Sequence, residues 1–73
     1  MLRLRSSVAH HRAGEFSALL REHEGVRRVV QQEDEALDSE AYVFVADVEP
    51  SCADVLVERI AEMGIPVDDY VLT

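Results

Sequence analysis

The stretch AYVFVADV, residues 41–48, has the composition of a β-strand and is apolar on both of its faces. A chain of 73 residues builds one small core and buries only about 60% of the surface that its unfolded form exposes. Its own helices can usually cover only one face of a sheet. The stretch therefore raises the question of what covers the second face of this strand.

The composition is that of a globular domain and argues against several classes of function. Hydrophobic residues make up 48% of the sequence, and 7 basic residues against 15 acidic ones give a net charge of −8. Such a charge repels phosphate backbones and anionic membrane surfaces, so no nucleic-acid partner is expected. The single cysteine, Cys52, excludes an internal disulfide and, with no signal-peptide pattern at MLRLRSSV, indicates a reducing, cytoplasmic setting. No apolar run approaches the ~18 residues of a membrane helix, which predicts that the chain as given is soluble.

The first half of the chain predicts a strand, a helix and a second strand. LRLRSSV, residues 2–8, alternates with period two and has one apolar face. The helical spacing of Phe16, Leu19, Leu20 and His23 predicts a helix over residues 13–24, with Gly25 as a left-handed helix end. VRRVVQQ, residues 26–32, predicts a weaker edge strand, and the acidic EDEALDSE, residues 33–40, predicts a solvated hairpin loop.

The second half repeats this order after the strand at 41–48. Ser51, followed three residues later by Asp54, resembles a capping box and predicts a helix start. Gly64 and Pro66 end that helix, and VDDYVLT, residues 67–73, predicts the last strand. The predicted apolar stripe of the helix consists of Cys52, Val55, Leu56, Ile60 and Met63.

Two such units with right-handed crossovers have one compact arrangement, the ferredoxin-like fold. We therefore expect a single α+β domain over residues 1–73, with a four-stranded antiparallel sheet and both helices on one of its faces. The first and third strands are expected at the centre of the sheet.

In this fold one face of the sheet stays open. We assign Tyr42, Phe44, Ala46 and Val48 to the helix side, and Val43, Val45 and Asp47 to the open face beside Arg3 and Arg5. The opposite phase of the strand is the alternative. Branched apolar side chains flanked by charges indicate a contact surface, so Arg3, Arg5, Val43 and Val45 are the expected interface residues. The competing interpretation is an ordinary surface, since exposed valines are common, but a small core benefits from the contact.

The histidines do not have the pattern of a metal site. Adjacent side chains such as His10 and His11 point apart, and a helix rising about 1.5 Å per residue carries His23 far from them. Cys-x-x-Cys is absent from the first loop, and neither a metal nor another cofactor is expected. The loop of His10, His11 and Arg12 is instead a candidate site for a small anion, because the free amides at a helix start favour negative charge.

No set of residues suggests catalysis. Cys52 lies at a predicted helix start but has no base in its half of the chain, so it is interpreted as a packed cysteine. Tyr42 and Phe44 alternate as base-stacking aromatics do in RNA-recognition domains, but the acids around them favour a role in the core. The acidic loop lacks the spacing of a calcium loop. Without a nucleophile and base, the chain is expected to be non-catalytic.

Several short motifs carry a resemblance to a known family. They are HEGV at residues 23–26, FVADV at residues 44–48 and ERIAEMGIPVDDYVLT at residues 58–73. With the strand that starts at Met1, the chain resembles, over essentially its whole length, the N-terminal soluble segment of a bacterial family of multi-span membrane proteins, a domain of unknown function. It is also similar in topology to ACT domains, which are amino-acid-binding regulatory domains that pair through sheets and helices and bind ligands at interfaces.

The sequence therefore predicts a non-catalytic interaction and regulatory module that self-associates or docks, through its open sheet face, on an adjacent domain of the same protein. The resemblance implies that it is the cytoplasmic domain of a membrane protein, and we expect a fragment whose membrane domain follows residue 73. The alternative is an ACT-type sensor of an amino acid or small anion, with its site at His10, His11 and Arg12.

Overall fold

The strands and α-helices of the chain follow one another in the predicted order. The computed structural model describes residues 1–33 and 41–73, so most of the predicted acidic loop, residues 34–40, lies outside the described residues. The elements are β1 (Leu2–Ala9), α1 (Ala13–Glu22), β2 (Val26–Glu33), β3 (Ala41–Val48), α2 (Ala53–Glu62) and β4 (Tyr70–Leu72). Short 3-10 helices precede α1, α2 and β4, and they are η1 (His10–Arg12), η3 (Pro50–Cys52) and η4 (Val67–Asp69).

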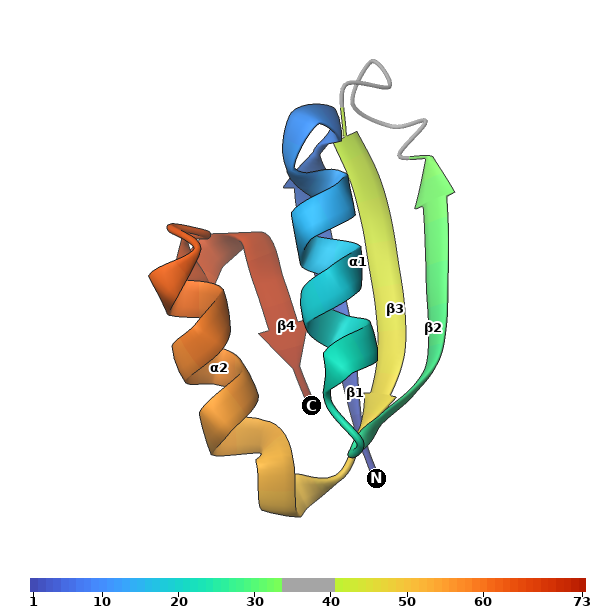
Figure 1. Cartoon of the computed structure of the whole chain (residues 1–73), viewed down its shortest axis with the longest axis vertical. Helices are drawn as coiled ribbons and strands as arrows, with labels where there is room; N and C mark the ends of the chain where they lie inside the picture. The colour runs from blue at the N-terminus through green and yellow to red at the C-terminus, as the bar shows by residue number, and fades with distance from the viewer. Residues whose placement is uncertain (34–40) are drawn as a thin grey trace.

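The four strands form one antiparallel sheet in the order β2-β3-β1-β4. β1 and β3 are central and pair along their whole length, from Leu2 opposite Val48 to Ala9 opposite Ala41. Both helices lie on the same side of the sheet, α1 over the central strands and α2 beside β4 (Figure 1). The predicted ferredoxin-like α+β fold is confirmed, and β2 is an edge strand as expected.

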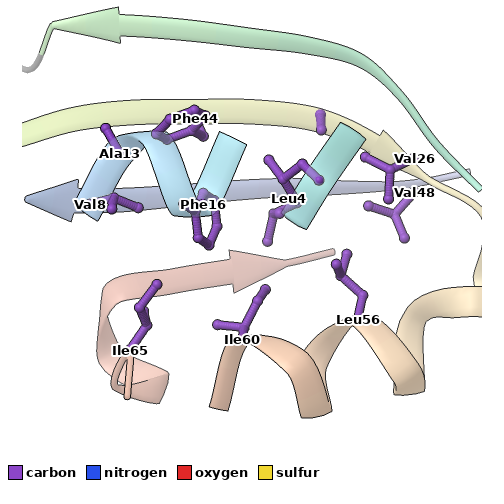
Figure 2. Close-up of a cluster of buried hydrophobic side chains, with 12 residues drawn as sticks. Leu4, Val8, Ala13, Phe16, Val26, Phe44, Val48, Leu56, Ile60 and Ile65 are labelled. Atoms are coloured by element: carbon purple, nitrogen blue, oxygen red, sulfur yellow. The ribbon is translucent and has the colours of Figure 1, made fainter. Parts of the chain in front are cut away.

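The core lies between the helices and one face of the sheet. Phe16 of α1 packs against Phe44 of β3, with ring centroids 5.1 Å apart and ring planes inclined by 59°. α2 contributes Leu56 and Ile60, which are fully buried (Figure 2). Phe44, Ala46 and Val48 belong to this core and Tyr42 packs against it, so the predicted phase of β3 is confirmed.

The start of α2 differs from the predicted capping box. The N-cap of α2 is Cys52, no side chain caps the helix, and Ser51 lies inside η3. Pro50 opens this 3-10 turn, whose Cys52 amide donates to the Glu49 carbonyl at 3.0 Å. The prediction was wrong because the turn satisfies backbone groups before the α-helix begins, leaving Ser51 no capping position.

The predicted apolar stripe of α2 is wrong at one position. Val55 is 50% exposed, whereas Leu56 and Ile60 are buried and Ala53 packs against the core. A short helix beside the edge strand β4 buries one narrow face, and the position directly before Leu56 points away from it.

The two glycines that flank the helices have different roles. Gly64 has φ +80° after α2, which confirms the predicted left-handed helix end. Gly25 does not have a positive φ, so the same prediction for α1 was wrong. A Cβ built on Gly25 would lie 2.6 Å from the Cys52 Sγ, which shows that a glycine is required there for close packing.

The last strand is shorter than predicted. Only Tyr70–Leu72 is assigned as strand, and Val67–Asp69 forms a 3-10 turn closed by the Asp69 amide, which donates to the Pro66 carbonyl at 3.0 Å. Pairing with β1 nevertheless reaches the last residue, because Arg3 and Thr73 exchange two backbone hydrogen bonds of 2.8 and 3.0 Å. The turn places Asp68 and Asp69 at the edge of the sheet.

Candidate interaction surface

The sheet face turned away from the helices, called here the open face, is built of three cross-strand rows. Residues directly opposite each other in an antiparallel pair project from the same face, so the register defines these rows. Row one contains Arg27, Asp47 and Arg3, row two contains Val30, Val45, Arg5 and Val71, and row three contains Gln32, Val43 and Ser7. Valines from β2, β3 and β4 therefore lie in one row, with Arg5 of β1 between Val45 and Val71.

The four predicted interface residues all lie on the open face. Arg3 and Arg5 project from β1, and Val45 of β3 pairs directly with Arg5. Val43 is only 9% exposed, although it lies outside the core cluster, so its neighbours on the open face already shield it. The structure thus brings the predicted residues together but leaves less of Val43 exposed than the sequence suggested.

Two exposed valines of row two were missed by the sequence analysis. Val30 of β2 is 44% exposed and Val71 of β4 is 56% exposed. Alternation with Tyr70 and Leu72 could have assigned Val71 to the open face. No pattern in VRRVVQQ could have assigned Val30, because its phase depends on an irregularity within β2.

That irregularity is a β-bulge at residues 28 and 29. The register between β2 and β3 shifts between Arg27 and Val30, and Arg28 has φ +56°, a left-handed conformation that is uncommon for a residue with a side chain. Because of the bulge, Val29 packs against the core and Val30 points to the open face. The bulge thus adds a valine to row two.

Charge on the open face is concentrated at the end where β1 begins. Asp47 is 3.7 Å from the Arg3 guanidinium and 3.8 Å from that of Arg28. Arg27 pairs with Glu49 at 3.3 Å. Within the part of the chain that the structure describes, no carboxylate lies within 4.0 Å of the Arg5 guanidinium. Among the described residues, Arg5 is therefore a cation of the middle row without an ion pair.

A shallow hollow adjoins Arg5 where β4 begins. Its volume is about 160 Å³, and it is lined by Arg5, Ser7, Val43, Asp68, Asp69, Tyr70 and Val71. Ser7 and Asp69 lie toward the end of the sheet where β4 begins, and the arginine-rich end is the other end of the sheet. The hollow therefore has a cation on one side and two carboxylates on the other.

A second hollow lies on the helix side, between α1 and the end of α2. It measures about 300 Å³ and is lined by Glu15, Ala18, Leu19, Glu22 and Met63. Glu15 is already paired with Arg12 at 3.0 Å. This hollow has an apolar floor and an acidic rim.

The predicted ligand residues His10, His11 and Arg12 form the 3-10 helix before α1. The His10 ring lies against the Tyr42 ring with centroids 4.3 Å apart, and Arg12 pairs with Glu15 in the first turn of α1. Neither of the two hollows is lined by any of the three.

The remaining candidates are placed in structural roles. Cys52 is half-buried against Gly25. His23 follows the last turn of α1, where its Nδ1 is 2.8 Å from the Leu19 carbonyl oxygen. Residues 1–33 and 41–73 contain no group of three or more side chains that could hold a metal ion. No helix within these residues is long and apolar enough to cross a membrane.

Comparison with known proteins gave no relative: no protein-family model, curated protein or solved structure matches the chain.

Proposed function

We propose that this chain is a non-catalytic interaction and regulatory module whose open face binds a second protein surface, either a second copy of the chain or an adjacent domain of the same protein. The observation that carries this proposal is row two, where Val30 and Val45 are neighbours and Val71 follows beyond Arg5, without a covering layer in the described residues. Arg5 within this row and Arg3 in row one would supply polar contacts to a partner.

The size of the domain is the physical reason for such contact. A chain of 73 residues has a small core, and domains of this size commonly gain stability from oligomerisation, metals or disulfides. An internal disulfide is impossible with one cysteine. Burying the half-exposed side chains of Val30 and Val71 would remove apolar surface from water, which is favourable by about 25 cal/mol per Å².

We also propose that the module is the cytoplasmic part of a membrane protein of unknown function. The support is a resemblance in sequence alone. HEGV, FVADV and the segment at residues 58–73 resemble the N-terminal soluble segment of a bacterial family of multi-span membrane proteins. The alternative, a small-ligand sensor at His10, His11 and Arg12, has less support, because these residues line neither hollow and Arg12 is already paired.

The solution mass of the chain tests the interaction proposal. We expect light scattering behind a sizing column to give a dimer or larger assembly for the wild type. Val45→Asp and Val71→Asp should shift the mass toward the monomer, because each would bury a charge in the contact. Val43→Asp should do the same, although this side chain is more shielded.

Val55→Asp is the matched control. Val55 and Val71 are exposed to a similar degree, 50% and 56%, but Val55 lies on α2. Val55→Asp should therefore leave the mass unchanged. Folded Val45→Asp and Val71→Asp variants with the wild-type mass would contradict association through the open face. A monomeric wild type would contradict self-association. Contact with an adjacent domain would then be tested in a longer chain that contains this domain, by measuring the protection of the row-two backbone amides from hydrogen exchange.

A further inference from the structure

The open face carries opposite charges at its two ends. We call Arg3, Arg27 and Arg28, where β1 and β2 begin, the basic end. We call Asp68 and Asp69, which precede β4, the acidic end. At the basic end, the three arginines form ion pairs with two carboxylates, those of Asp47 and Glu49. The arginines outnumber these carboxylates, so the pairs leave a net positive charge. The valines of rows two and three lie between the ends.

We infer that the open face binds the open face of a second copy about a two-fold axis that runs across the strands, so that the facing strands are antiparallel. This inference rests on the proposed function and specifies its partner. An axis perpendicular to the strands sets row two of one copy against row three of the other, so that Arg5 approaches the acidic end of the second copy, twice in each dimer. An axis parallel to the strands through the middle of the sheet would instead set Arg5 against Val45 of the second copy, away from its acidic end.

The register indicates where the axis passes. If it lies between rows two and three, Val45 of one copy faces Val43 of the other, and the apolar centres of both faces pack together. Arg5 then faces Ser7 of the second copy. Asp69 of that copy directly precedes the neighbouring strand β4, one strand spacing of about 4.8 Å to the side. Among the described residues, no carboxylate lies within 4.0 Å of the Arg5 guanidinium.

Arg5 and Asp69 also border one hollow within a single chain, so the test must separate contacts within a chain from contacts between chains. Arg5→Asp would place a carboxylate against Asp69 of the second copy, and Asp69→Arg would place two cations together. Each single variant should weaken the dimer by about tenfold or more, since two contacts per dimer change from attraction to repulsion.

Mixing the two single variants is the decisive measurement. In the mixed dimer, the new carboxylate of the Arg5→Asp chain would meet the new guanidinium of the Asp69→Arg chain, and the native Arg5 and Asp69 would form the second contact. Native mass spectrometry of the mixture should therefore show a heterodimer with at least wild-type affinity, while each variant alone remains mainly monomeric. A contact made only within a chain would not be restored by mixing. Circular dichroism checks that each variant is folded.

The net charge provides a further control. Arg5→Asp makes the chain more acidic than its net −8, and Asp69→Arg makes it less acidic, yet both should weaken the dimer. Glu22→Arg on α1 changes the charge in the same direction as Asp69→Arg and should have no effect, unless the acidic helix-side hollow is the contact.

The outcomes distinguish this inference from the proposed function. Dimers lost in both single variants and restored in the mixture support the two-fold, antiparallel contact. Two outcomes overturn this alignment but leave the open face as the interface. In the first, both charge variants lose the dimer and the mixture does not restore it. In the second, the charge variants keep the dimer while Val71→Asp still gives monomers. A wild type that stays monomeric also overturns it. Val45→Asp and Val71→Asp without effect on a wild-type dimer would overturn the proposed function as well.

Discussion

A contact between Gly25 and Cys52 joins the two halves of the fold at the scale of single residues. The Gly25 carbonyl accepts a hydrogen bond of 2.8 Å from the Glu49 amide. This bond holds the turn after α1 against the segment that leads into α2. The Cys52 side chain fills the space where a Cβ of residue 25 would be. Cys52 is thus explained as a packing residue, as its sequence context suggested.

Gly25→Ala should destabilise the fold. The added methyl group would lie 2.6 Å from the Sγ and 3.2 Å from the Cβ of Cys52, and overpacking of this kind costs about 1–3 kcal/mol. Gly14→Ala is the control, because nothing lies within 4 Å of a Cβ at that helical position. It should be neutral or stabilising by about 0.5 kcal/mol. Urea unfolding of both variants measures the difference, and equal stabilities would contradict the packing role of Gly25.

The bulge in β2 shows how one irregular element shapes the candidate surface. A regular strand would alternate through residues 26–33 without interruption, and Val30 would then take the phase of Val26, which lies on the core side. The two-residue interruption allows Val29 to contact the core and Val30 to join row two. The left-handed conformation of Arg28 is the local cost of this arrangement.

Arg28→Val should lower the free energy of unfolding by at least about 1 kcal/mol more than Arg27→Val does. A β-branched side chain is strongly disfavoured at φ +56°, while residue 27 is not left-handed. Both arginines are exposed and each forms one surface ion pair, so the pair provides a matched comparison. Chemical denaturation gives the two values. A smaller loss for Arg28→Val than for Arg27→Val would show that the bulge is not strained.

The whole molecule depends on a core that one aromatic pair dominates. Phe16 and Phe44 are fully buried and join α1 to the central strand β3. At about 0.05–0.15 kcal/mol per residue, a chain of 73 residues has a stability of about 4–11 kcal/mol. The loss of one large core side chain is therefore comparable with the whole stability of the domain.

Phe16→Ala should remove about 3–5 kcal/mol and leave the chain largely unfolded near 37 °C. Val55→Ala, on the exposed side of α2, should change the stability by less than about 0.5 kcal/mol. Thermal unfolding followed by circular dichroism measures both. A cooperative transition of Phe16→Ala close to that of the wild type would contradict the central position of this side chain.

Much of the fold could be predicted because its signals are local. The alternation in residues 41–48, the helical spacing in residues 13–24 and the glycine at 64 each constrain a few consecutive residues, and the element order follows from them. The arginines and valines of the two central strands could be placed on the open face for the same reason. The capped start of α2 and the length of β4 were mispredicted, because 3-10 turns that compete with caps and strand ends have weak sequence signals.

Local signals in the sequence were sufficient for the order of the elements and the ferredoxin-like arrangement, since apolar periodicity and turn residues act over short distances along the chain. The folded sheet was needed to fix the phase of the central strand, to show that Gly25 packs against Cys52, to bring Val30 to the open face and to place acidic and basic groups at its opposite ends. These features depend on contacts and register between segments far apart in the sequence, and such contacts exist only once the sheet has formed.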